Sequence, residues 1–67
     1  MKLSARNVLK GKVVQVKKGV TTCNVKIDVG GTVITSTITM DAAKDLKLKR
    51  GDRAYAIIKA SEVIVGK

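Results

Sequence analysis

Two short segments near opposite ends of the chain are rich in hydrogen-bond donors, Ser4-Ala5-Arg6-Asn7 and Lys59-Ala60-Ser61-Glu62. The first combines a hydroxyl, a guanidinium, an amide and consecutive backbone N–H groups, and the second adds an ammonium, another hydroxyl and further N–H groups. A fully ionised oxyanion accepts hydrogen bonds and donates none, so a pocket of donors with one or two cations matches it. Each segment also has a simpler interpretation on its own, a solvated arm for the first and a β-turn for the second.

The side chains on which most enzymes and transition-metal sites depend are scarce. The chain has no histidine and a single cysteine, which argues against a metal site made of these residues. Cys23 lies in an apolar alternation and is interpreted as a small buried hydrophobic residue. Asp41 and Asp45 have ordinary capping and surface interpretations, and nothing suggests a nucleophile with its base. The sequence therefore predicts a binding protein and not an enzyme, with no direct metal ligands from the protein.

The composition indicates a small, strongly basic domain that is almost free of aromatic residues. At 67 residues the chain is expected to form one domain, residues 1–67, with a marginal hydrophobic core. The formal net charge of +9 favours anionic partners of some kind. Association with further copies is the remaining way to stabilise so small a core. The sequence lacks the apolar runs of a signal peptide or membrane helix, so a cytoplasmic protein is expected.

The elements that must position the donor segments are mostly strands. Residues 7–17 form a valine-rich run whose irregular phase predicts a bend or bulge near Gly11. Strict alternation of apolar and polar residues over 23–29 predicts a second strand. Gly30 and Gly31 then supply the positive φ angles of a tight hairpin.

The second half of the chain predicts three more strands and one helix. The third strand is expected at residues 32–40, and Asp41 is expected to cap a short helix that ends at residue 46. Two further strands are expected at residues 54–60 and 62–65. Five short strands with one helix between the third and fourth are the element order of the OB-fold. The sequence thus predicts an all-β, five-stranded Greek-key barrel that closes its own edges.

Longer stretches around the donor segments resemble the molbindins, the molybdenum-binding single-domain members of the transport-associated OB (TOBE) group. The similar stretches are residues 4–13, 39–41, 46–52 and 55–63. The resemblance implies reversible binding of molybdate or tungstate, for storage and homeostasis, with no chemical conversion and no organic cofactor. The residues it implies for the oxyanion site are Ser4, Ala5, Arg6, Thr39, Lys59, Ala60 and Ser61, with Asn7 as a further donor.

One position departs from the pattern of that family. Its members commonly place a serine directly after the aspartate that starts the helix, whereas this chain has Ala42. One hydroxyl donor is therefore missing, and either a neighbouring backbone N–H or Asn7 could replace it. In the resulting interpretation Arg6 and Lys59 supply the charge, and hydroxyls and main-chain amides fix the orientation of the anion.

The resemblance also implies a homo-hexamer arranged as a trimer of dimers, with oxyanions bound between subunits. It further implies a second class of site built from main-chain amides. The turn Gly19-Val20-Thr21-Thr22 is the candidate for that second site. Sequence does not separate molybdate, tungstate and sulfate, because these dianions share one shape and differ by small changes in bond length.

Two other functions fit parts of the sequence. A nucleic-acid-binding OB-fold module would account for the basic charge, but single-strand binders stack bases on aromatic side chains and this chain has only Tyr55. A molybdate-sensing accessory domain would bind the same ligand and act through a partner protein. No membrane association is expected.

Overall fold

The computed structural model describes residues 2–67, which form four strands, one α-helix and one 3-10 helix. In chain order these are β1 (Asn7–Lys18), β2 (Thr22–Asp28), β3 (Val33–Thr39), α1 (Met40–Leu46), β4 (Arg53–Ile58) and η1 (Ala60–Glu62). The fold is all-β with one short helix between the third and fourth strands, as the sequence predicts.

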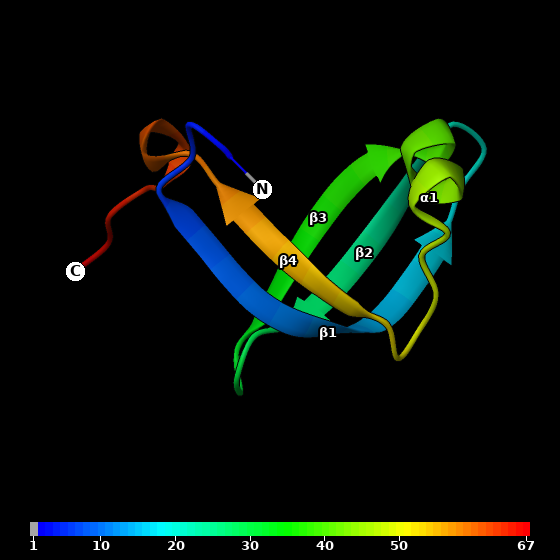
Figure 1. Ribbon diagram of the computed structural model, residues 1–67, viewed down its shortest axis with the longest axis horizontal. Coiled ribbons are helices and arrows are strands. Elements are labelled where there is room, and N and C mark those ends of the chain that lie inside the picture. Colours follow the sequence, from blue (N-terminus) through cyan, green and yellow to red (C-terminus); the bar gives the residue numbers. More distant parts are fainter. Residues whose placement is uncertain (1) are drawn as a thin grey trace.

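The four strands form one antiparallel sheet in the order β3-β2-β1-β4. The sheet is strongly curled, so that the first half of β1 and β4 rise on one side, and the second half of β1 rises with β2 and β3 on the other (Figure 1). The helix α1 lies beyond the far end of β3. Because β3 and β4 are the two outermost strands, the sheet is an open barrel with two free edges.

The prediction of a fifth strand at residues 62–65 is wrong. The described chain turns through η1 after β4, and residues 63–67 pair with no strand. The sequence predicted a strand there because Val63, Ile64 and Val65 are β-branched, which favours extended backbone. A strand also needs an edge to pair with, and the C-terminal segment runs away from the sheet (Figure 1). The prediction that the chain closes its own barrel is therefore also wrong.

The long strand β1 holds the sheet together because it pairs with both β2 and β4. Its register against β2 shifts between Val13 and Gln15, which marks a bulge two residues after the predicted position at Gly11. Gly11 serves a different purpose. A Cβ atom there would lie 2.4 Å from the backbone oxygen of Asp28, so only glycine lets the two strands cross so closely at the bend.

The hairpin between β2 and β3 forms where the sequence predicts it. Gly30 and Gly31 have φ angles of 95° and 100°, which other residues rarely adopt. Their N–H groups both donate to Oδ1 of Asp28, at 3.2 and 2.8 Å. This turn sets the register in which Ile27 faces Ile34, so that the apolar residues of both strands share the inner face.

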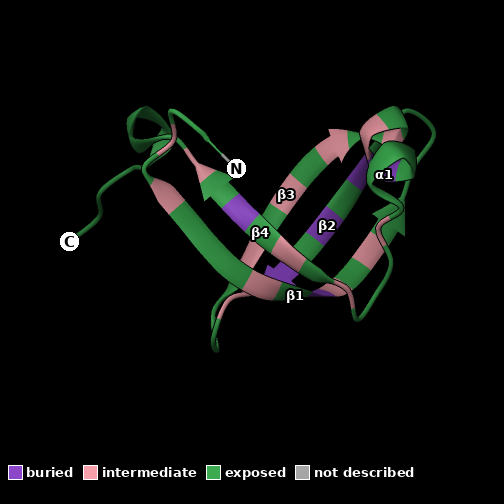
Figure 2. Cartoon of the chain, in the orientation of Figure 1, coloured by how far each residue is buried: buried purple, intermediate pink, exposed green. Residues whose placement is uncertain are grey.

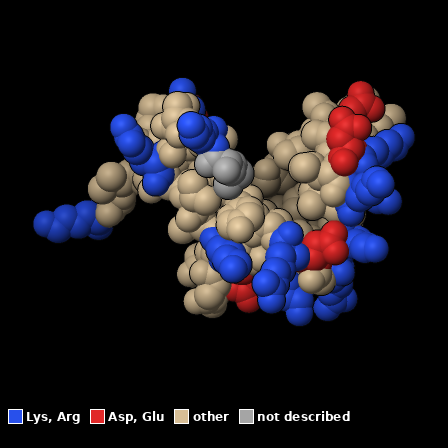
Figure 3. Space-filling view, in the orientation of Figure 1, with Lys and Arg blue, Asp and Glu red and all other residues tan. Residues whose placement is uncertain are grey.

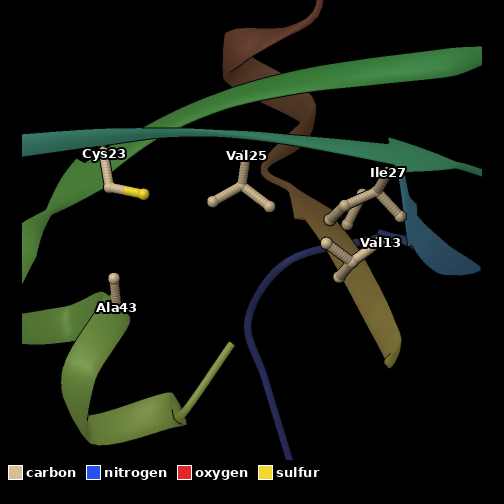
Figure 4. Close-up of a cluster of buried hydrophobic side chains, with 6 residues drawn as sticks. Val13, Cys23, Val25, Ile27 and Ala43 are labelled. Carbon is tan, nitrogen blue, oxygen red and sulfur yellow. The ribbon is translucent and has the colours of Figure 1, made fainter. Parts of the chain in front are cut away.

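The core is small and lies in the fold of the curled sheet (Figure 2). Its buried side chains are Val13, Cys23, Val25, Ile27, Ala43 and Ala56. Figure 4 shows the inner face of β2 directed at Val13 on one side and at Ala43 of α1 on the other. Cys23 is buried as predicted. Many large apolar side chains remain exposed, among them Ile64 at 94% and Val65 at 89%.

The helix α1 begins at Met40, two residues before the predicted first residue Ala42, and has a different cap. Thr39 is the N-cap, and its hydroxyl accepts a hydrogen bond of 3.1 Å from the backbone N–H of Ala42. Asp41, the predicted cap, lies inside the first turn, where a negative charge still favours the helix N-terminus. Both residues are good caps, and the last hydrogen bond of β3 decides between them by keeping Thr39 extended.

Candidate oxyanion-binding site

The two donor-rich segments lie at the same end of the sheet. Asn7, the first residue of β1, pairs with Ile58, the last residue of β4. The Nδ2 amide of Asn7 also donates to the carbonyl oxygen of Ile58 at 3.1 Å. Arg6 and Lys59 are therefore the next residues beyond a paired strand end, one on each chain segment. Figure 1 shows η1 beside the N-terminal arm at this end.

The charged and hydroxyl side chains of this end are open to solvent. Ser4, Arg6, Lys59 and Ser61 are all exposed, and Ala5 is half-buried. No side chain caps η1, so its first backbone N–H groups have no side-chain acceptor. The arrangement offers two cations, two hydroxyls and main-chain donors to an anion that approaches from solvent.

Thr39 is not part of this group within one chain. It pairs with Thr22, which adjoins the pairing of Cys23 with Lys18 at the opposite end of β1. At about 3.3 Å per residue, the run from Asn7 to Lys18 covers roughly 35 Å of strand. Figure 1 shows the start of β1 and the end of β3 on opposite sides of the molecule. One chain therefore cannot bring Arg6 and Thr39 to the same small anion.

The hydroxyl of Thr39 retains a free donor although it caps α1. A hydroxyl has one O–H donor and two acceptor lone pairs, and the cap uses one acceptor. The backbone N–H of Ala42 is occupied by that bond, so it does not replace the serine hydroxyl that this position lacks. Asn7, the other candidate replacement, lies at the far end of β1.

The turn expected to form a second anion site is partly closed on itself. The N–H of Gly19 donates to the carbonyl oxygen of Thr22 at 2.8 Å, and the carbonyl oxygen of Thr21 accepts from Met40 at 2.9 Å. The side chain of Val20 is 97% exposed. The amide of Gly19 is thus used inside the turn, and the remaining candidate donors of this turn belong to Val20, Thr21 and Thr22.

An apolar groove between the two free sheet edges is a feature that sequence reasoning missed. It has a volume of about 410 Å³ and is lined from both edges by Val25, Ile27, Ser36, Ile38, Leu46, Leu48, Arg53, Ala54, Tyr55 and Ile57. No local pattern in the sequence shows this groove, because its lining residues come from β2, β3, β4, the end of α1 and the loop that follows.

The remaining classes of site find no support in the part of the chain that is described. Over residues 2–67, no group of three His, Cys, Asp or Glu side chains could hold a metal ion. Over the same residues, no helix is long and apolar enough to cross a membrane.

Comparison with known proteins identifies relatives of the same size. The chain is 54% identical over 67 residues to a probable molybdenum-pterin-binding protein of Haemophilus influenzae, covering 98% of this chain and 97% of that protein. It is 47% identical over 66 residues to molybdenum-pterin-binding protein 3 of Clostridium pasteurianum, covering 97% of each chain.

The solved structures that resemble this chain are also of molybdate-binding proteins. A molybdate-binding protein of Sporomusa ovata matches with a TM-score of 0.95 and 39% identity, over the whole of both chains. The cytoplasmic molybdate-binding protein ModG, solved with molybdate bound, matches with a TM-score of 0.91 and 46% identity, over 96% of this chain and 46% of ModG.

Residues 3–65 match the TOBE domain, which spans both donor segments and all four strands. Together with relatives of equal length, this match confirms the resemblance to the molbindins and the OB-type fold. The chain belongs to the TOBE domain family.

Proposed function

We propose that the protein binds molybdate reversibly, for storage and homeostasis of the oxyanion, and does not convert it. The observation that carries the proposal is the pairing of Asn7 with Ile58, which brings Arg6 and Lys59 to one end of the sheet. Support comes from the relatives, which are named for binding molybdate or a molybdenum-pterin compound. Binding of tungstate is part of the proposal, because it offers the same charge and the same acceptors.

In the proposed site, charge and orientation come from different groups. The guanidinium of Arg6 and the ammonium of Lys59 attract the dianion and form the strongest hydrogen bonds, because both partners are charged. The hydroxyls of Ser4 and Ser61 and the N–H groups of Ala5 and Ala60 then fix its orientation. These groups are donors, so the bound oxyanion finds partners for its acceptor lone pairs.

The site as proposed needs a second copy of the chain. Thr39 lies at the opposite end of the sheet from Arg6, so a site that contains both must take Thr39 from a neighbouring protomer. This agrees with the expectation that oxyanions bind between subunits. The same contact would place the free O–H of the helix-capping Thr39 on the anion, without loss of the cap.

The shape of the single chain supports association. Two sheet edges are unpaired, an apolar groove lies between them, and the chain's own C-terminal segment is extended and exposed. A segment with Val63, Ile64 and Val65 from a second copy has the β propensity and apolar character to occupy such a groove. We propose that the one-domain protomers assemble in this way into a hexamer, a trimer of dimers, in the cytoplasm.

A test of the function compares oxyanions on the purified protein. Isothermal titration at physiological salt should show that molybdate and tungstate bind much more tightly than sulfate. Tight binding of single-stranded oligonucleotide with no response to molybdate would instead favour the nucleic-acid-binding alternative. Sulfate binding as tight as molybdate binding would contradict the proposed ligand.

A further inference from the structure

A hollow beside the C-terminal end of α1 is surrounded by lysines. It has a volume of about 290 Å³ and is lined by Lys18, Met40, Ala43, Lys44, Lys47, Leu48 and Lys49. The lysines come from three parts of the chain: the last residue of β1, the helix α1 with its C-cap, and the loop that follows. It lies at the opposite end of β1 from Arg6 and Lys59. Figure 3 shows both basic and acidic residues on the side where α1 lies.

No carboxylate lines this hollow in the part of the chain that is described. The nearest acidic residues in sequence are Asp41 and Asp45 on α1 and Asp52 after the loop. Oδ2 of Asp52 accepts a hydrogen bond of 3.0 Å from the backbone N–H of Lys49, which directs this carboxylate to the loop backbone. Four lysines line one hollow and no acidic residue is among its described lining residues, so an anion that enters it is attracted by their positive charge.

The ordinary interpretation of basic residues at a helix end explains only part of the cluster. Lys44 and Lys47 lie at the C-terminus of α1, where positive charge is favoured by the helix dipole. Lys18 belongs to β1 and Lys49 to the following loop, so the dipole does not account for their convergence on the same hollow.

The backbone at Lys47 adds an independent observation. Lys47 is the C-cap of α1 and has φ 51° and ψ 42°, in the left-handed region. It is the only residue other than glycine with positive φ in the described chain. Glycine or asparagine is favoured at such a position, because a Cβ atom strains the left-handed conformation. Here the strained position carries a long cationic side chain that lines the hollow.

We propose that this hollow binds a diphosphate group. Lysine is a strong phosphate ligand as a point charge, and a diphosphate carries more negative charge near neutral pH than one phosphate or one molybdate group. Two linked groups therefore match four ammonium groups better than a single tetrahedral dianion does. The apolar side chains of Met40, Ala43 and Leu48 leave the lysines as the side-chain donors of the hollow. A free diphosphate and the diphosphate of a nucleotide present the same chemistry to the lysines.

The test is a titration of the full chain with sodium diphosphate at physiological salt, followed by calorimetry and by the amide NMR shifts of Lys18 and residues 40–49. Saturable binding with shifts confined to these residues is expected. The double variant Lys44→Gln, Lys49→Gln should bind diphosphate about tenfold more weakly, since each exposed charge contributes modestly. Its molybdate affinity should stay within about twofold.

The matched control is Lys10→Gln with Lys26→Gln, which removes the same charge from exposed strand positions outside the hollow. It should keep the affinity for diphosphate. Equal losses in both double variants, or orthophosphate binding as tightly as diphosphate, would overturn the proposal. Titration with ADP distinguishes the sources. If ADP binds with the same affinity as diphosphate, the diphosphate group alone is recognised. If neither compound binds, the proposal is overturned.

Discussion

At the scale of single residues, the proposed chemistry depends on a few donors that the strands bring together. Arg6 and Lys59 are exposed, but each follows a residue whose backbone is fixed by the β1–β4 pairing. Thr39 is fixed by its role as the cap of α1. The anion therefore meets side chains whose starting points are already ordered, which lowers the entropy lost on binding.

Replacement of either cation should weaken molybdate binding. Arg6→Ala or Lys59→Ala is expected to cost about 1.5 to 3 kcal/mol, the usual contribution of a hydrogen bond to a charged group. The dissociation constant measured by calorimetry should rise by one to two orders of magnitude. Lys26→Ala, an exposed lysine in the middle of β2, is the control and should leave the affinity nearly unchanged. Unchanged affinity in both site variants would remove the site assignment.

The two roles of Thr39 can be separated by one substitution. Aspartate caps helices as well as threonine does, but it has no O–H to donate and carries a negative charge. Thr39→Asp should therefore keep the thermal stability and lose at least tenfold in molybdate affinity. Thr39→Ser should keep both. If Thr39→Asp binds molybdate as well as the unchanged protein, Thr39 does not contact the anion.

At the scale of elements, the bend of β1 decides which residues meet. Without the bulge between Val13 and Gln15 and the close crossing at Gly11, β1 could not pair with β2 at one end and β4 at the other. Pairing of β1 with β4 places Arg6 and Lys59 at one end of the sheet. Pairing of β1 with β2 forms the other end, where α1 lies. The geometry of this one strand therefore separates Arg6 and Lys59 from the lysine-lined hollow, whereas Thr39 lies at the α1 end, as the hollow does.

Substitution at Gly11 should destabilise the fold. In Gly11→Ala the new Cβ atom would lie 2.4 Å from the backbone oxygen of Asp28 and 2.7 Å from Cγ2 of Ile27, so the strands must move apart. Overpacking of this kind costs about 1 to 3 kcal/mol in the free energy of unfolding, measurable by urea denaturation. Gly66→Ala is the control, because nothing lies within 4 Å of a Cβ atom there. Equal stability of the two variants would mean that the close crossing is not needed.

Elements with strong local signals could be predicted from the sequence, and elements that depend on a partner could not. The alternation in residues 23–29 and the pair Gly30-Gly31 correctly predicted β2 and its hairpin, because the pattern and the turn are local. The segment at residues 62–65 has the same β propensity, but after η1 it runs away from the sheet and pairs with neither free edge of its own chain. The cap of α1 was assigned to Asp41 instead of Thr39, because the end of β3 depends on pairing with β2.

The candidate site was predictable to a similar extent. The two donor segments could be expected to meet, because strands β1 and β4 are neighbours in an OB-type barrel. The position of Thr39 on the opposite side depends on the length and curvature of β1. The lysine-lined hollow brings together residues of β1, α1 and a loop, and no local pattern shows that these three converge.

At the scale of the whole molecule, the single chain is an incomplete barrel. Six buried residues form its core, while large apolar side chains remain exposed along the groove and the C-terminal segment. A chain of this size gains stability from association, and binding of dianions between subunits would offset part of the repulsion between chains of net charge +9. Ligand binding and assembly should therefore stabilise each other.

A charge in the C-terminal segment should disrupt the assembly. The side chain of Ile64 is 94% exposed in the single chain, so Ile64→Asp should have no effect on an isolated protomer. If this side chain enters the groove of a second copy, the carboxylate loses its hydration and the oligomer should dissociate, as measured by native mass spectrometry. Gly66→Asp places the same charge two residues further along and should leave the oligomer intact. An Ile64→Asp protein of unchanged subunit number would contradict this assembly.

The central claim is tested most directly by the anomalous scattering of tungsten in a crystal of the protein grown with tungstate. The account predicts a tungsten peak within hydrogen-bond distance of Arg6 and Lys59 of one protomer, with the hydroxyl of Thr39 from a second protomer on the same anion. Tungsten peaks away from both cations, or a structure in which Arg6 and Lys59 lie far apart with no tungsten between protomers, would contradict it.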